Sequence, residues 1–254
     1  MLAKRSLKPF FTFYGGKWRV APHYPVPVFD TIVEPFAGSA GYSMRYPDRN
    51  VVLVERDPLI AATWRYLLRV SPAEILALPD IAPGQTVADL GVCEEAQLLI
   101  GWWCNKGTTS PCKTPSAWMR SKTRPNSYWG STIRERIASQ VERIRHWMLI
   151  EGDYEQAPAV EATWFVDPPY QDAGKHYRFN GSKIDYGRLA HLCSASWRGQ
   201  VIVCESVGAS WLPFRPWRDI KASEAKHGGK ISREAIWTSE CGCPPCRARK
   251  DKEE

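Results

Sequence analysis

The most chemically informative stretch is Trp164-Phe165-Val166-Asp167-Pro168-Pro169-Tyr170, an apolar run that ends in a carboxylate, two prolines and a tyrosine. Short apolar runs bounded in this way predict buried β-strands. Proline fixes φ, lacks an N–H and restricts the residue before it, so the Asp167 carboxylate and the carbonyls of Asp167 and Pro168 should lie in a stiff, extended loop. This loop offers hydrogen-bond acceptors and an aromatic ring, with few donors. We therefore expect it to suit an amino group on a flat ring that can stack, such as N6 of adenine.

Asp167-Pro168-Pro169-Tyr170 resembles the catalytic motif of the DNA methyltransferases that methylate amino groups. Two stretches upstream match the Dam-like DNA adenine methylases in the same order, namely Phe13-Tyr14-Gly15-Gly16-Lys17 and Glu34-Pro35-Phe36-Ala37-Gly38-Ser39-Ala40-Gly41. The resemblance runs from about residue 9 to about residue 240. It implies an α/β, Rossmann-like methyltransferase fold that depends on S-adenosylmethionine, with a mostly parallel sheet and a C-terminal antiparallel hairpin. The implied activity is methylation of adenine N6 in double-stranded DNA.

The resemblance also implies a pocket for S-adenosylmethionine. Lys17 is expected to pair with the methionine carboxylate, and Phe13 and Tyr14 to line the same pocket. Thr31-Ile32-Val33 predicts the first buried strand, and the turn from Glu34 to Gly38 follows it. Ligands bind at the carboxyl ends of such strands in Rossmann-like units, so we expect this turn to contact the cofactor.

The second strand is predicted at Val51-Val52-Leu53-Val54 and is closed by Glu55. An acid at this position hydrogen-bonds ribose hydroxyls in nucleotide-binding units, a role that we favour over a merely solvated strand end. Asp153 lies in a segment that resembles the family's sequence beside the cofactor's adenine. Alanine stands at Ala40, where the family usually has a glycine, and glycine follows at Gly41; we expect the loop to persist because alanine is small. The residues predicted to bind the cofactor are Phe13, Tyr14, Lys17, Glu34, Phe36, Ala37, Gly38, Glu55, Asp153 and Asp167.

The predicted chemistry depends on the acceptors of the prolyl loop. The Asp167 carboxylate, expected to be ionised without a shifted pKa, and the Pro168 carbonyl would each accept a hydrogen bond from N6 and free its lone pair. Tyr170 would stack on a base flipped out of the duplex. The predicted catalytic residues are Asp167, Pro168, Pro169 and Tyr170. Cytosine N4 or an RNA amino group would suit the same acceptors, but the family's cytosine enzymes more often have serine at the position of Asp167. A DNA-binding relative without turnover is a further alternative.

The segment from Asn105 to Gly130 contains basic residues and no acidic ones. Basic side chains neutralise phosphates and aromatic rings meet bases, so we interpret the segment as DNA-facing rather than as a solvated loop. Its aromatic residues are Trp118, Tyr128 and Trp129. The predicted DNA contacts are Lys106, Lys113, Arg120, Lys122 and Arg124 here, Lys175 in the polar loop after Tyr170, and Lys226 and Lys230 in a predicted hairpin tip.

The domain prediction is a catalytic domain formed by residues 1–104 and 131–240, an inserted target-recognition segment at 105–130, and a tail at 241–254. After Ser131 or Thr132, apolar residues recur every three or four positions and predict one long helix. The residues of this stripe are Ile133, Ile137, Val141, Ile144 and Met148.

The composition fits one sizeable core and a polyanionic partner. The chain has 254 residues, of which 34 are lysine or arginine and 27 are aspartate or glutamate, giving a net charge of +7. No apolar run approaches the ~20 residues of a membrane span, so we expect a soluble, cytoplasmic protein with reduced cysteines and no obligate protein partner. Cys241, Cys243 and Cys246 lack an obvious fourth ligand, so we favour a tail of reduced thiols over a zinc site and assign no metal ligand.

Overall fold

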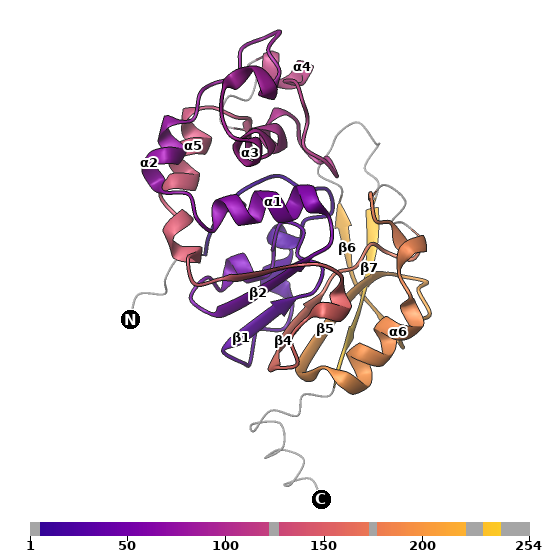
Figure 1. Cartoon of the computed structure of the whole chain (residues 1–254). Helices are drawn as coiled ribbons and strands as arrows, with labels where there is room; N and C mark the ends of the chain where they lie inside the picture. The colour runs from indigo at the N-terminus through magenta and orange to yellow at the C-terminus, as the bar shows by residue number, and fades with distance from the viewer. Residues whose placement is uncertain (1–5, 122–126, 173–176, 222–230, 240–254) are drawn as a thin grey trace, which may run out of the picture.

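The computed structural model describes residues 6–121, 127–172, 177–221 and 231–239, and every structural statement below concerns these residues (Figure 1). Their strands form one sheet in the order β3-β2-β1-β4-β5-β7-β6, parallel except for β7, which runs antiparallel to both of its neighbours. The strands are β1 Thr31–Glu34, β2 Asn50–Glu55, β3 Met148–Glu151, β4 Glu161–Val166, β5 Arg198–Ser206, β6 Arg215–Lys221 and β7 Ile231–Thr238. The first five follow the 3-2-1-4-5 order of Rossmann folds. The predicted fold class, a mostly parallel Rossmann-like sheet with a C-terminal antiparallel hairpin, is therefore confirmed.

Both faces of the sheet are covered, which explains why its central strands are continuous apolar runs. Alternate residues point to opposite faces, so Leu53 and Phe165 belong to one hydrophobic cluster and Val54 and Val166 to the other. The α-helices are α1 Pro58–Leu67, α2 Pro72–Ala77, α3 Glu94–Cys104, α4 Ala117–Arg120, α5 Ser131–Ala138 and α6 Tyr186–His191. Short 3-10 helices span Lys17–Arg19, Ala21–His23, Ser43–Arg45, Val87–Leu90, Val141–Ile144, Tyr154–Gln156 and Gly181–Lys183, and a π-helical turn spans Leu192–Ser196.

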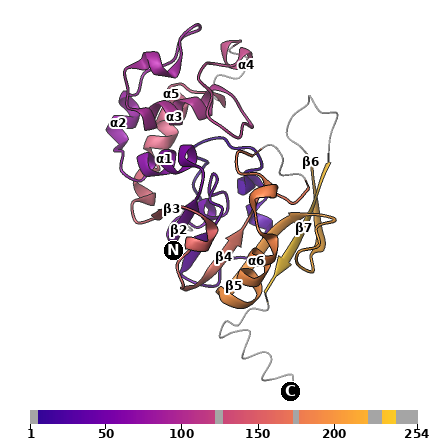
Figure 2. The same ribbon diagram turned by 45° about the vertical axis from the view of Figure 1, so that its right-hand side comes forward.

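Helices α2, α3, α4 and α5 form a lobe between α1 and β3 in the chain, set beyond α1 and away from α6 in both views (Figures 1 and 2). The described part of the predicted recognition segment belongs to this lobe. Tyr128 and Trp129 are buried there, and the Trp129 indole donates to the carbonyl of Pro79 at 2.8 Å. The expectation that these two rings meet bases is therefore wrong, because they anchor the segment to the lobe.

The predicted long helix after residue 130 is also wrong. Helix α5 ends at Ala138, a 3-10 turn follows at Val141–Ile144, and Met148 begins β3 with its side chain 57% exposed. The reason lies at Gln140, whose side-chain amide pairs with the main chain of Lys8, donating at 2.7 Å and accepting at 3.0 Å. This contact with the N-terminal segment ends the helix, although the apolar spacing continues beyond it.

Candidate active site

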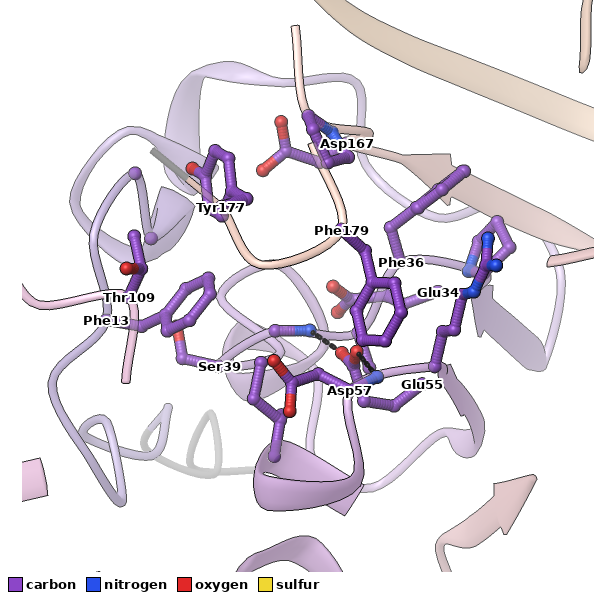
Figure 3. A pocket seen from close by; sticks show the side chains of 18 of the residues that line it. Phe13, Glu34, Phe36, Ser39, Glu55, Asp57, Thr109, Asp167, Tyr177 and Phe179 are labelled. Atoms are coloured by element: carbon purple, nitrogen blue, oxygen red, sulfur yellow. Dashed lines mark hydrogen bonds between the residues drawn. The ribbon is translucent and has the colours of Figure 1, made fainter. Parts of the chain in front are cut away.

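A single pocket opens at the carboxyl ends of β1, β2 and β4 (Figure 3). The carboxyl ends of neighbouring parallel strands meet at one edge, so Glu34, Glu55 and Asp167 all line it. Every residue predicted to bind the cofactor lines this pocket: Phe13, Tyr14, Lys17, Glu34, Phe36, Ala37, Gly38, Glu55, Asp153 and Asp167. Of the predicted catalytic residues, Asp167 and Pro169 line it as well. The structure thus brings the three motifs together.

The turn after β1 has a left-handed backbone at two positions, Gly38 with φ of 46° and Ala40 with φ of 50°. The loop therefore persists with alanine in place of glycine, but at a position where an L-residue is strained. Gly41 has a different task. A Cβ there would lie 2.5 Å from the main-chain nitrogen of Trp18, so glycine is needed for the N-terminal segment to pack against the turn.

Glu55 organises one end of the pocket (Figure 3). One carboxylate oxygen accepts from the Gly38 N–H at 2.8 Å and the other from the Asp57 N–H at 2.8 Å. Burial raises the pKa of Glu55 to about 7, although these hydrogen bonds oppose the rise. Because each oxygen has a second lone pair, the carboxylate can still accept from a ribose hydroxyl.

Aromatic and cationic groups gather near Glu55. Phe36 stacks on Tyr154 with ring centroids 5.2 Å apart, and Phe179 faces the pocket from the loop after the prolyl motif (Figure 3). The Arg56 guanidinium lies 4.9 Å from the Phe179 ring and pairs with the Asp153 carboxylate at 2.9 Å. Sequence reasoning missed Phe179 and Arg56, since neither belongs to a recognisable motif.

Described residues of the polar loop after Tyr170 border this pocket: the Tyr177 hydroxyl donates to the Tyr14 carbonyl at 3.2 Å, and the Tyr177 ring packs 5.9 Å from that of Phe13. Glycine at Gly15 permits this approach, because a Cβ there would lie 2.4 Å from the Tyr177 hydroxyl oxygen.

Lys17 makes a contact that the sequence did not predict. Its Nζ lies 2.8 Å from Oδ1 of Asp167, 3.2 Å from the carbonyl of Gly15 and 4.9 Å from the centre of the Tyr170 ring. Burial disfavours the charged ammonium, but the negative charges of Asp167 and Glu234 outweigh it and raise the pKa of Lys17. The expected partner was a cofactor carboxylate, whereas the structure pairs Lys17 with Asp167.

The pKa of Asp167 is raised to about 6, so the expectation of an unshifted carboxyl group is wrong. Burial is the main cause; Lys17 opposes it, while the carboxylates of Glu234 and Glu205 add to it. A pKa of about 6 still leaves the group mostly ionised at neutral pH, as expected.

The prolyl corner, defined here as Asp167 to Tyr170, is held by groups from later elements of the chain. The Tyr186 hydroxyl at the start of α6 donates to the Pro169 carbonyl at 2.6 Å, and the Tyr170 hydroxyl donates to the carboxylate of Glu234 in β7. The N–H of Gln171, the next residue along, donates to Glu205 at 2.7 Å. The hydroxyl of Tyr170 is therefore fixed by Glu234. Stacking of a base on the Tyr170 ring remains a prediction.

The predicted DNA contacts lie partly within the described residues. Lys113 and Arg120 are exposed on the helical lobe, and Lys106 lies 5.5 Å from the Tyr128 ring. Five others lie outside the described residues, as do the cysteines of the tail: Lys122, Arg124, Lys175, Lys226 and Lys230. The three predicted contacts that the structure describes thus lie on the helical lobe, which also contributes Thr109 to the pocket.

Comparisons with known proteins add little to this geometry. No family model and no curated protein matches the chain. Among solved structures, "Putative methyltransferase yhhF from Escherichia coli" matches with a TM-score of 0.31 and 12% identity, over 81% of this chain and 74% of that chain. A match of that quality supports no argument about function, so the fold assignment depends on the sheet order. Among the described residues, no helix is long and apolar enough to cross a membrane.

Proposed function

We propose that the protein transfers a methyl group from S-adenosylmethionine to N6 of an adenine flipped out of double-stranded DNA. One observation carries the proposal: Asp167 and Pro169 of the prolyl corner line the same pocket as Glu55 and Gly38 of the turn after β1. A turn suited to a nucleotide and a corner suited to an amine then share one cavity. Direct methyl transfer requires this arrangement, because the donor and the acceptor must lie side by side. The order and content of the three motifs resemble those of the Dam-like enzymes, and the sheet supplies the matching fold.

The residues of the pocket fit the proposed donor, which supplies an electrophilic methyl group on a cationic sulfonium. Glu55 would accept a ribose hydroxyl, and the rings of Phe36 and Phe179 offer apolar faces for adenine. The carboxyl groups of buried Glu34 and partly buried Asp167 favour a positive charge between the strand ends. The cations Lys17 and Arg56 also line the pocket, and each is paired with a carboxylate, Asp167 and Asp153 respectively.

Asp167 would act on the acceptor nitrogen. Its carboxylate and the Pro168 carbonyl would accept the two N6 hydrogens, which localises the nitrogen lone pair for attack. As the bond from N6 to the methyl group forms and the bond from the methyl group to sulfur breaks, positive charge would develop on N6 and a fixed carboxylate would stabilise it. The methylated nitrogen would then release one of its two protons to solvent and become neutral. Tyr170 would stack on the extruded base, a contact worth ~1–3 kcal/mol in comparable sites. Basic residues of the helical lobe would contribute phosphate contacts that hold the duplex.

The test is expression of the chain in a host that lacks DNA methylation, followed by nucleoside mass spectrometry and single-molecule sequencing of the host DNA. We expect N6-methyladenine in a fixed sequence context. Asp167→Ala should lower transfer by at least ~100-fold, the scale of losing one transition-state contact, with S-adenosylmethionine affinity in calorimetry largely retained. N4-methylcytosine or methylated RNA would favour the alternative substrates. Near-parental DNA methylation by Asp167→Ala, or a parent that does not bind the donor, would refute the proposal.

A further inference from the structure

Glu205 is a buried carboxylate for which the proposed mechanism has no direct use. It lies near the end of β5 and its side chain is 0% exposed. No ion pair to it is seen among the described residues, so its negative charge is compensated by hydrogen bonds. A buried charge without a cation is expensive unless every lone pair is used. Such a group persists in a fold when it has a task that an apolar side chain cannot perform.

Four donors surround the Glu205 carboxylate. Oε1 accepts from the Gln171 N–H at 2.7 Å and from the Trp211 indole N–H at 3.2 Å. Oε2 accepts from the Ser206 N–H at 2.6 Å and from the Ser206 hydroxyl at 3.1 Å. The second oxygen thus binds its own strand end. The first oxygen binds Trp211 in the loop that follows β5 and Gln171, which is 34 positions away and directly follows the prolyl corner.

The prolines explain why this anchor is needed. Pro168 and Pro169 have no N–H, so neither proline can hold the corner in place by donating a main-chain hydrogen bond. The N–H of Gln171 is among the first main-chain donors after them, and Glu205 accepts from it. A shift at Gln171 would pass directly into the Pro168 carbonyl and the Asp167 carboxylate, because the prolyl backbone between them is stiff.

Glu205 reaches the corner by a second route. It fixes the Trp211 indole, and the Trp211 ring packs 5.4 Å from the ring of Tyr186. The Tyr186 hydroxyl in turn donates to the Pro169 carbonyl at 2.6 Å. One buried carboxylate therefore holds the corner from both sides, through a main-chain N–H on one side and two packed rings on the other.

We propose that Glu205 is a positioning residue that fixes the prolyl corner in its amine-accepting geometry. The inference rests on the proposed methyl transfer, and Glu205 itself touches neither donor nor base in this scheme. Glu205→Gln keeps the shape but replaces one acceptor oxygen with a donor, so at least one pair of the four donors loses its acceptor. Misplacement by about 1 Å costs on the order of 100-fold in rate.

The experiment measures single-turnover methyl transfer to DNA by Glu205→Gln between pH 6 and pH 9, with donor affinity by calorimetry. We expect the rate plateau to fall by about 10- to 100-fold while the donor Kd stays within about twofold. Glu161→Gln, an exposed carboxylate at the start of β4, is the matched control and should retain the parental rate. If Glu205 acted only through its charge, which raises the pKa of Asp167, the substitution would shift the acidic side of the pH–rate profile and leave the plateau rate unchanged. Glu205→Met removes both acceptor oxygens, so an unchanged plateau in both Glu205→Gln and Glu205→Met would overturn the proposal.

Hydrogen exchange at the Gln171 amide supplies a readout that does not depend on activity. We expect faster exchange in Glu205→Met, which has no acceptor for this N–H, than in the parent, and equal exchange would contradict the anchor. If the parent itself transfers no methyl group, the proposed function fails while this measurement still decides the anchor. If Glu205→Gln does not fold, Trp211→Phe tests the second route, because it keeps a ring beside Tyr186 but removes the donor to Glu205. A parental plateau in that variant would count against that route.

Discussion

Replacing Lys17 by methionine should change how methyl transfer depends on pH. Nζ of Lys17 is 2.8 Å from Oδ1 of Asp167, and the two side chains are only 10% and 20% exposed. The ammonium therefore opposes burial and the charges of Glu234 and Glu205, which raise the pKa of Asp167. Methionine keeps most of the side-chain volume and removes the charge. The carboxyl group would then hold its proton to a higher pH, and the neutral form lacks the negative charge that would stabilise the amine as it becomes positive in the proposed mechanism.

The magnitude follows from the strength of a close ion pair. A positive charge in contact with a carboxylate lowers its pKa by about 1–3 units, so removal of Lys17 should raise the pKa of Asp167 by about 2 units. The acidic side of the pH–rate profile should shift up by the same amount. The parental pKa of about 6 leaves most of Asp167 ionised at pH 7. In Lys17→Met the ionised fraction at pH 7 would be about one tenth, so the rate should fall about tenfold there and recover near pH 9.

The assay is single-turnover transfer of a labelled methyl group to DNA from pH 5.5 to pH 9.5, with donor affinity measured by calorimetry. Lys17→Arg keeps the charge and should leave the acid limb near its parental position. Lys8→Met removes an exposed lysine outside the pocket and should behave like the parent. A rate loss equal at all pH values, with a donor Kd raised tenfold or more, would refute this reasoning and assign Lys17 to the cofactor carboxylate instead.

Two further predictions concern stability. Burial raises the pKa of Glu34 from 4.5 to about 8, so the native state binds a proton more tightly than the unfolded chain, and this stabilisation is lost as pH rises between those values. Glu34→Gln, which can still accept from Ser43, should therefore gain in urea-unfolding free energy relative to the parent between pH 5 and pH 8; a constant difference would contradict the assigned pKa. Ala40→Gly should leave the unfolding free energy within about 1 kcal/mol of the parent, because relief of the left-handed backbone is offset by glycine's entropic cost and by loss of a fully buried methyl group. A loss of more than about 1 kcal/mol in urea unfolding would show that Ala40 is unstrained.

The sequence was sufficient to predict the side chains that the three motifs contribute to the pocket, although not Arg56 and Phe179. Apolar runs that end in Glu34, Glu55 and Asp167 predict parallel strands, and parallel strands place their carboxyl ends together. Motif order then added Phe13 and Tyr14 from the N-terminal segment. These inferences succeed because they depend on local backbone preferences and on one rule of sheet topology.

The contacts between these side chains could not be predicted in the same way. Lys17 and Asp167 belong to separate motifs with separate expected partners, and only the packed structure shows that they pair. Glu205 follows an apolar strand without a motif, so its bond to Gln171 has no local signal. The end of α5 was missed for the same reason, since it depends on the pairing of Gln140 with a main chain 132 positions away.

The carboxyl groups in the pocket would respond to the charge of the proposed donor. Glu34, Glu55 and Asp167 line the pocket, and each has a raised pKa because burial disfavours the carboxylate form. Asp167 adds to the rise at Glu34, so the two groups oppose each other's ionisation. In the proposed function a cationic sulfonium relieves this opposition and favours ionised Asp167, the form that the amine needs. After transfer the sulfur would carry no charge, so Glu34 and Asp167 would again oppose each other's ionisation and would hold the spent donor less strongly.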